Sequence, residues 1–192
     1  MRAVLLRRVE ERDGISCGSA CFPGNDVMVH LSDTSPAGAR PAGFRPLPLL
    51  SGTGFDAAIG GFDVAESDGR LLAGFTVEPR HCNHAGICHG GMIATVFDGY
   101  MAMATLFEND LQVPILPTMS LGVDFLAPGM PGDWIEFSAD VLRITRNTVF
   151  VQGLARVKGK PIGRASGVYK RIAPDPEFPL DTGKLLRDFM RS

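Results

Sequence analysis

The chain has 192 residues and a mass of 20.6 kDa, the size of one domain with short additions. Apolar residues make up 45% and charged residues 21%, a composition near the globular average that excludes a chain disordered throughout. The net charge of −2 and the pI near 6.1 argue against nucleic acid as a partner. No uninterrupted run of about eighteen apolar residues occurs, so we expect no membrane-spanning segment.

The cysteines and the first residues favour a cytoplasmic protein with reduced thiols. Four cysteines, Cys17, Cys21, Cys82 and Cys88, are too few for a disulfide framework in a chain of this length. Residues 3–6 form only a short apolar run and acidic residues soon follow, unlike a secretory signal or a transit peptide.

Residues 1–50 are predicted to be a Pro/Gly-rich arm. Of all the aromatic residues, only Phe22 and Phe44 lie before residue 55, and residues 35–50 (SPAGARPAGFRPLPLL) show no usable period. Such a segment cannot bury much surface by itself, so we expect it to be disordered. We expect the folded domain over residues 51–175 and a C-terminal tail over residues 176–192, which can form a short helix.

Alternating apolar residues predict five strands. The first covers residues 71–77, after a turn at residues 67–69, and the others cover residues 119–125, 135–141, 149–157 and, more weakly, 162–172. The short turns that separate the later strands favour an antiparallel meander with one buried face.

The segment between these strand regions, residues 90–107 (GGMIATVFDGYMAMATLF), has the pattern of a long helix. Its apolar residues recur at helical spacing, and most of the opposite face is apolar as well. A helix that is apolar nearly all round must be buried nearly all round. The sequence therefore predicts an α+β fold in which a curved antiparallel sheet wraps around one central helix.

Asp98 is the only charged residue between Arg80 and Glu108. A carboxylate on a buried helix is costly to desolvate, and its pKa should be raised unless it is paired. A structural carboxylate bonded to a neighbouring turn or to a partner subunit is one interpretation. We favour a catalytic one, because buried titratable groups concentrate at functional sites.

The helix is preceded by an unusual turn, NHAGICHGG at residues 83–91. Gly90 and Gly91 cost helix stability, about 1 kcal/mol each relative to Ala. They also allow a ligand to approach the free N–H groups at a helix N-terminus, as an oxyanion hole requires. A tight turn into the helix would use the same glycines.

The combination of these features is more specific than any of them alone. The pattern N-x5-H-G-G-x6-D over residues 83–98 is followed by Thr118, which opens a strand ending in FLAP at residues 125–128. This pattern resembles the hotdog-fold acyl-CoA thioesterases, in particular the branch with the phenylacetate-pathway and thioesterase-superfamily member 2 enzymes. The resemblance extends from about Phe55 to Ile172.

The resemblance implies roles for five residues. Asp98 would act as general base or nucleophile, and the Gly90 N–H would donate to the thioester carbonyl. Asn83 would orient the water or the carbonyl, His89 would brace the turn, and Thr118, across a dimer interface, would hold the attacking water.

The same resemblance implies an acyl-CoA substrate, aryl or fatty-acyl, no metal, and a homodimer or homotetramer with its active sites at the dimer interface. Substrate-binding positions are expected at Gly91, Tyr100 and Met101. A positioned carboxylate and one or two oxyanion donors suffice for a thioester, which is already reactive.

Other interpretations remain open at this stage. Five His and Cys residues in the segment 81–89 invite a zinc site, but their spacing does not match paired Cys-x2–4-Cys ligands. A non-catalytic hotdog protein that senses acyl-CoA is the main alternative function. A hydratase of the same fold ranks lower, because the sequence lacks the His and acid pair at the spacing of those enzymes.

Overall fold

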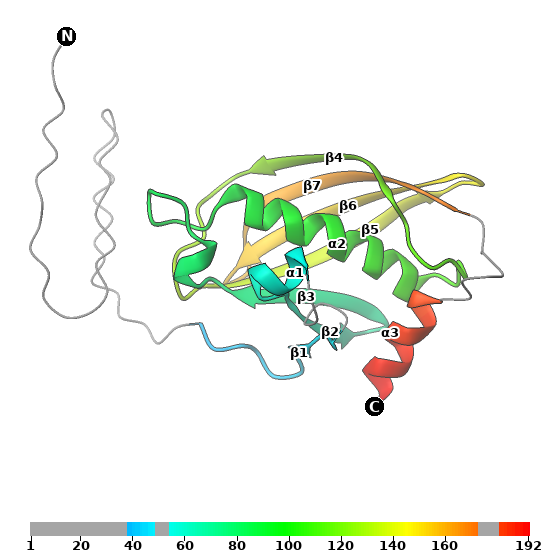
Figure 1. Ribbon diagram of the computed structural model, residues 1–192, viewed down its shortest axis with the longest axis horizontal. Helices are drawn as coiled ribbons and strands as arrows, with labels where there is room; N and C mark the ends of the chain where they lie inside the picture. Colours follow the sequence, from blue (N-terminus) through cyan, green and yellow to red (C-terminus); the bar gives the residue numbers. More distant parts are fainter. Residues whose placement is uncertain (1–37, 49–53, 173–180) are drawn as a thin grey trace, which may run out of the picture.

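The computed structural model of the protein describes residues 38–48, 54–172 and 181–192, and within them seven strands form one sheet. In chain order the elements are β1 (Arg45–Pro46), α1 (Phe55–Ile59), β2 (Asp63–Ser67), β3 (Arg70–Thr76), a 3₁₀ helix (Pro79–His81), α2 (Gly90–Glu108), β4 (Thr118–Phe125), β5 (Trp134–Ile144), β6 (Thr148–Val157), β7 (Lys160–Lys170) and α3 (Thr182–Arg191). All neighbouring strands are antiparallel, and the sheet curves around α2 (Figure 1). The predicted α+β fold, a curved antiparallel sheet around one long helix, is confirmed.

The strand order differs from the predicted meander. It is β1-β2-β3-β5-β6-β7-β4, so β5, β6 and β7 follow one another as predicted. The prediction that β4 precedes β5 in the meander is wrong, because β4 pairs with β7 at the edge of the sheet. Residues 126–133 carry the chain across from β4 to β5. Apolar alternation carries no information on which strand lies beside which.

The core lies between α2 and the concave face of the sheet. Phe97, Tyr100 and Met101 of α2 have no exposed surface. Two glycines of the sheet make room for them: a Cβ on Gly153 would lie 2.7 Å from the Met101 sulfur, and one on Gly167 would lie 2.6 Å from the Met101 methyl. Small residues in β6 and β7 therefore allow the helix to approach the sheet closely.

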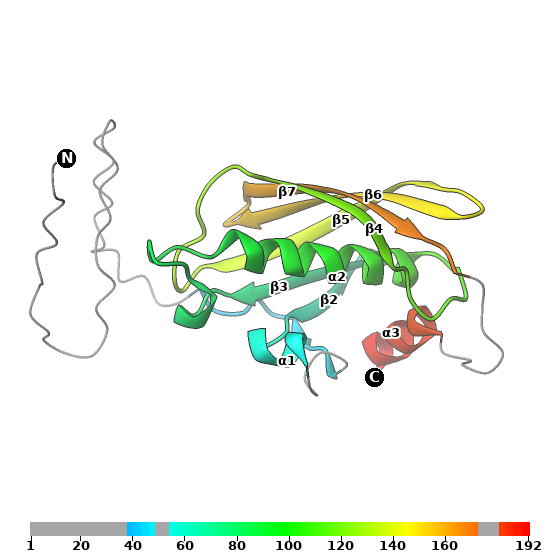
Figure 2. The same ribbon diagram turned by 45° about the horizontal axis from the view of Figure 1, so that its top comes forward.

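α2 is long and apolar enough to cross a membrane by length and composition alone. It is the one helix among the described residues that meets these two criteria. It runs along the sheet in both views, and 56% of its most apolar stretch is buried inside the protein (Figure 2). Its apolar character is therefore accounted for by the core.

The end of the expected arm packs on the domain. Residues 1–37 and 49–50 lie outside the described residues, but Phe44 and Leu47 are buried and β1 pairs with β2. The Phe44 ring meets the Trp134 ring edge to face, with centroids 4.9 Å apart. The expectation that this segment buries little surface is thus wrong for residues 44–47, because their partners come from a distant strand.

The C-terminal tail contains the helix that its sequence allowed. Asp181 caps α3 by accepting a hydrogen bond from the Lys184 N–H at 2.8 Å, and Leu186 is fully buried. The Arg187 guanidinium donates to the Leu106 carbonyl at 3.1 Å, which fixes α3 against the end of α2 (Figure 2).

Candidate active site

The N-terminus of α2 is shaped by His89 and the two glycines that follow it. His89 is the N-cap residue, and its Nδ1 accepts a hydrogen bond from the Gly91 N–H at 2.8 Å. Within the described part of the chain, the Gly90 N–H donates to no acceptor. Because the first N–H groups of a helix lack intrahelical partners, this group is available to a ligand oxygen.

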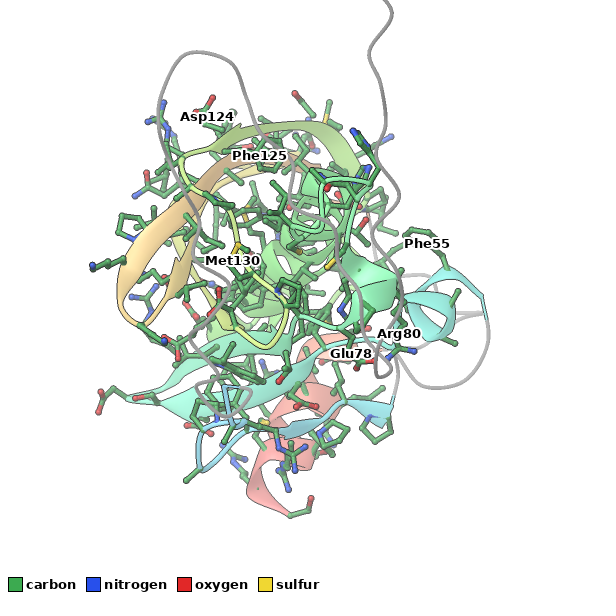
Figure 3. All side chains as sticks on the ribbon, turned by 90° about the vertical axis from the view of Figure 1, so that its left-hand side faces the viewer. Phe55, Glu78, Arg80, Asp124, Phe125 and Met130 are labelled. Carbon is green, nitrogen blue, oxygen red and sulfur yellow. The ribbon has the colours of Figure 1, made fainter. Side chains whose placement is uncertain are left out.

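Both glycines have side chains of neighbouring residues close to them. A Cβ on Gly90 would lie 3.0 Å from the ring of Phe125, at the end of β4, and one on Gly91 would lie 2.8 Å from His89 Nδ1. The Gly90 backbone is therefore flanked by an aromatic ring that is 54% exposed. Phe125 lies near the top of the molecule in Figure 3, next to Asp124.

The loop before α2 is held by internal hydrogen bonds. Asn83 Oδ1 accepts from the Ala85 N–H at 2.9 Å, an Asx-turn, and Gly86 has a φ of 76°. The side-chain oxygen of Asn83 is thus occupied by the Ala85 N–H. The side-chain NH2 group of Asn83 is the group that would contact a ligand.

His81 holds the segment before α2 in place, a role that its sequence position did not predict. It is buried, and its Nδ1 accepts from the Glu78 N–H at 3.0 Å, so Nε2 carries the proton and donates to the Ile59 carbonyl at 2.8 Å. The His81 carbonyl in turn accepts from the His89 N–H at 2.8 Å. His81 thus connects α1, the 3₁₀ helix and the start of α2. The only signal in the sequence is that His81 lies in a segment rich in His and Cys.

Asp98 and Thr118 lie together in one chain. Thr118 Oγ1 donates to Asp98 Oδ1 at 2.6 Å, a short charge-assisted hydrogen bond. Both residues belong to the same chain, so the predicted place of Thr118 across a dimer interface can hold only relative to the Gly90 turn and not relative to Asp98. Asp98 is half-buried in the single chain, not deeply buried as its helix had suggested, because it faces the edge strand β4.

A β-bulge in β4 places the Thr118 side chain on the side of Asp98. The register of β4 against β7 shifts between Thr118 and Ser120, so that Thr118 pairs with Tyr169 and Leu121 pairs with Gly167. Directly opposed residues point to the same face of a sheet, which places Thr118 on the face turned toward α2. Met119 is extruded by the bulge and is 60% exposed, although strict alternation had placed it on the buried face.

Tyr169 of β7 anchors α2 at the position of Asp98. Its hydroxyl donates to the Asp98 carbonyl at 3.3 Å, and its side chain is fully buried. Burial, with the Asp98 charge adding to it, raises the pKa of Tyr169, so that it remains a neutral hydrogen-bond donor. The only signal for Tyr169 in the sequence is its position in the weak strand pattern of residues 162–172.

Tyr100 and Met101 have packing roles, contrary to their expected place in a substrate pocket. Both are fully buried, and the Tyr100 hydroxyl donates to the Leu71 carbonyl at 2.7 Å. Met101 fills the space left by the glycines of β6 and β7.

A cavity of about 370 Å³ opens beside the N-terminus of α2. Its walls come from α1, the loop before α2 and the first turns of α2, and they include Phe55, Ile59, Arg80, His89, Gly91 and Met92. Of the predicted substrate-binding residues, Gly91 alone lies in this wall. Figure 3 looks onto this end of the molecule, with Arg80 and Phe55 on the same side.

The predicted site residues form two groups along α2. Asn83, His89, Gly90 and Gly91 gather at its N-terminus, whereas Asp98 and Thr118 lie further along the helix. Gly90 and Asp98 are about 12 Å apart along the axis, at a rise of about 1.5 Å per residue. One carbonyl group of a ligand cannot touch both groups of a single chain.

The described residues contain no group of three or more His, Cys, Asp and Glu side chains that could hold a metal ion. Three of the five His and Cys residues of the segment 81–89 are part of the loop structure: His81 and His89 accept hydrogen bonds from backbone N–H groups, and Cys88 is buried.

A curved antiparallel sheet around a long helix, with polar residues at the helix N-terminus and at mid-helix, is the arrangement of hotdog proteins. Residues 85–161 match the family model described as "Thioesterase superfamily". Among curated proteins, "Putative esterase PA0474" of Pseudomonas aeruginosa is 29% identical over 134 residues, which cover 67% of this chain and 95% of that protein. Human "Acyl-coenzyme A thioesterase 13" is 26% identical over 87 residues, covering 45% of this chain and 61% of that protein.

Solved structures agree with the family match. Thioesterase superfamily member 2 of zebrafish has a TM-score of 0.58 and 25% identity, covering 64% of this chain and 90% of that one. The E. coli PaaI protein from the phenylacetic acid degradation operon has a TM-score of 0.53 and 25% identity, covering 60% of this chain and 86% of that one. The chain therefore has the hotdog fold of these structures, and its residues 85–161 are similar to the thioesterase superfamily.

Proposed function

We propose that this protein hydrolyses an acyl-CoA thioester to a free acid and coenzyme A. The observation that carries the proposal is the Asp98–Thr118 pair, a half-exposed carboxylate hydrogen-bonded at 2.6 Å on the central helix of a thioesterase-superfamily fold. The name of the human relative, an acyl-coenzyme A thioesterase, supports the substrate class. The acyl group can be aryl or aliphatic.

The active site of this proposal is built from two chains. Because the Gly90 N–H and the Asp98 carboxylate are about 12 Å apart in one chain, the Gly90 turn of one copy has to meet the Asp98–Thr118 pair of another. Exposed apolar residues on β4 and its flanks, Ile115, Met119, Phe125 and Leu126, support such a contact.

In the proposed reaction the thioester carbonyl accepts a hydrogen bond from the Gly90 N–H of one chain. A water bound by the Asp98–Thr118 pair of the other chain attacks the carbonyl carbon, and the Asp98 carboxylate takes its proton. The tetrahedral oxyanion collapses, the C–S bond breaks, and the coenzyme A thiolate leaves and is protonated. A general base contributes about 10²- to 10⁴-fold, and one oxyanion donor about 3 kcal/mol.

Release of coenzyme A, followed with a thiol reagent, tests this function. Phenylacetyl-, benzoyl-, short, medium and long aliphatic acyl-CoAs would each be incubated with the wild-type protein and with Asp98→Asn. We expect turnover of at least one substrate, with the variant reduced by about 10²-fold or more. Absence of turnover for all of them, with acyl-CoA still bound, would instead identify a non-catalytic acyl-CoA sensor.

A further inference from the structure

Cys82 and Cys88 stand opposite each other at the two ends of the loop that leads into α2. They form an antiparallel β-bridge. Two hydrogen bonds flank the pair, from the Asn83 N–H to the Ile87 carbonyl at 2.9 Å and from the His89 N–H to the His81 carbonyl at 2.8 Å.

This pattern fixes the placement of the two side chains. Because the hydrogen bonds are made by the neighbours of Cys82 and Cys88, the two cysteines are a non-hydrogen-bonded antiparallel pair. The Cα atoms of such pairs are about 4.5 Å apart, and their side chains leave the ribbon on the same face. Disulfides span Cα distances of about 4.4 to 6.8 Å, so a bond between these sulfurs requires little backbone movement.

We propose that Cys82 and Cys88 form a reversible disulfide that closes the loop before α2. Both sulfurs are thiols in this structure. The Cys82 thiol donates to the Glu78 carbonyl, with a sulfur–oxygen distance of 3.5 Å. The Cys88 sulfur lies 3.9 Å from the His89 carbonyl oxygen. These contacts are weak compared with a covalent bond, and both can be given up on oxidation.

The two thiols differ in their access to solvent, and this difference determines which of them an oxidant reaches first. Cys82 is half-buried and lines the cavity of about 370 Å³ together with Arg80 and Met92. Cys88 is only 4% exposed. Burial, with the nearby Cys82 adding to it, raises the pKa of the Cys88 thiol to about 12. An oxidant therefore reaches Cys82 first.

A small disulfide of the glutathione class is the oxidant that this access allows. The Cys82 thiolate attacks one sulfur of the oxidant, forming a mixed disulfide and expelling one thiolate. The Cys88 thiolate then attacks the Cys82 sulfur, and the second thiolate leaves. The protons of both cysteines end on the two released thiols, so the protein loses two hydrogens and the oxidant is reduced to two thiols.

The bond would constrain the residues at the start of α2. The closed loop contains Asn83, and Cys88 is followed directly by the N-cap His89 and by Gly90. Formation of the disulfide does not depend on the proposed thioesterase activity, since it follows from the pairing of the two strands alone. Its effect on turnover does depend on that activity.

Mass spectrometry of the full-length chain tests the proposal without any activity measurement. The Cys17→Ser/Cys21→Ser variant would be treated with excess glutathione disulfide in mildly alkaline buffer and digested. We expect a mass loss of two hydrogens, a linked peptide pair joining Cys82 to Cys88, slower hydrogen exchange in residues 83–91, and full reversal by dithiothreitol.

Two further variants in the same background separate the steps. Cys88→Ser should stop at a glutathione adduct on Cys82, and Cys82→Ser should remain unmodified because Cys88 is buried. The proposal is overturned if the background protein itself retains glutathione on Cys82 with no internal bond, or resists the reagent. It is also overturned if Cys88 reacts as fast in the Cys82→Ser variant.

Discussion

Asp98 is the residue on which the proposed hydrolysis depends most directly. The Asp98→Asn change keeps the size of the side chain and can keep the hydrogen bond with Thr118, but it removes the base. We expect turnover of acyl-CoA to fall about 10²- to 10⁴-fold with the fold intact by circular dichroism. Asp68→Asn is the matched control: Asp68 lies in the exposed β2–β3 turn with a φ of 52°, which Asn tolerates. Equal turnover in the two variants would contradict the role of Asp98.

Gly90 offers an equally direct test of the oxyanion donor. Gly90 is the first residue of α2 and follows an extended N-cap residue, a position where proline fits a helix. Gly90→Pro removes the N–H without breaking the helix, and the half-exposed Phe125 ring can shift to admit the proline ring. We expect kcat to fall about 10²- to 10³-fold, with acyl-CoA binding retained in a calorimetric titration. Unchanged kcat would exclude this N–H as the donor.

At this scale the sequence identified the candidate residues but not how they are arranged. Asp98 stands out because it is a lone charge on an apolar helix, and Gly90 and His89 stand out by their spacing. The contact between Thr118 and Asp98 depends on a bulge in β4, and no residue type marks that bulge. Tyr169 and His81 act through backbone groups, which leave no pattern in a single sequence.

At the scale of elements, the packing around α2 predicts that two glycine-to-alanine substitutions change the free energy of unfolding in opposite directions. A Cβ on Gly99 of α2 would meet only Met103 and Phe62, at 3.8 and 3.9 Å. Gly99→Ala should therefore raise the free energy of unfolding by about 0.4–1 kcal/mol, since alanine is the better helix former. A Cβ on Gly153 of β6 would lie 2.7 Å from the Met101 sulfur and 2.9 Å from the Phe97 ring.

Gly153→Ala should consequently lower the free energy of unfolding by about 1–3 kcal/mol, the usual range for overpacking a core. Urea unfolding of both variants at one protein concentration measures the two effects. Stabilisation by Gly153→Ala would contradict the close approach of α2 to β6.

Glu108, the last residue of α2, predicts that the stability of the protein depends on pH. Desolvation raises the pKa of Glu108 above its ordinary value of 4.5, against the opposing effects of Arg70 and of the Leu71 N–H, which donates to it at 3.3 Å. A carboxyl whose folded pKa is raised contributes stability below pH 4.5, and this contribution is lost as the pH rises through the folded pKa. Glu108→Gln should therefore become more stable relative to wild type between acidic and neutral pH. A difference in urea midpoint that stays constant over that range would contradict this.

The elements with strong apolar periodicity were predictable from the sequence. The elements whose formation or position depends on the strand beside them were not. The long helix and five of the strands follow from apolar spacing in residues 71–172. β1 has two residues and exists because it pairs with β2, and β2 itself alternates poorly. The position of β4 at the sheet edge depends on a crossover, which local pattern does not encode.

At the scale of the whole molecule, the edge strand β4 predicts self-association. Met119 is extruded by its bulge and is 60% exposed, beside the exposed Phe125 and Leu126. We expect a dimer or a larger assembly in analytical ultracentrifugation, and a shift toward monomer for Met119→Glu. Leu142→Glu, at a bulge of β5 with 59% exposure, is the matched control and should leave assembly unchanged. A monomeric wild-type protein would contradict a site shared between chains.

The shared site itself is tested most directly by subunit complementation. Asp98→Asn and Gly90→Pro chains with different affinity tags would be co-expressed, and the mixed dimer purified over both tags. One of its two sites then combines an intact Asp98 with an intact Gly90. Because the sites of a symmetric dimer are equivalent, we expect about half of the wild-type turnover per dimer. Turnover of the mixed dimer no higher than that of either variant alone would contradict the account.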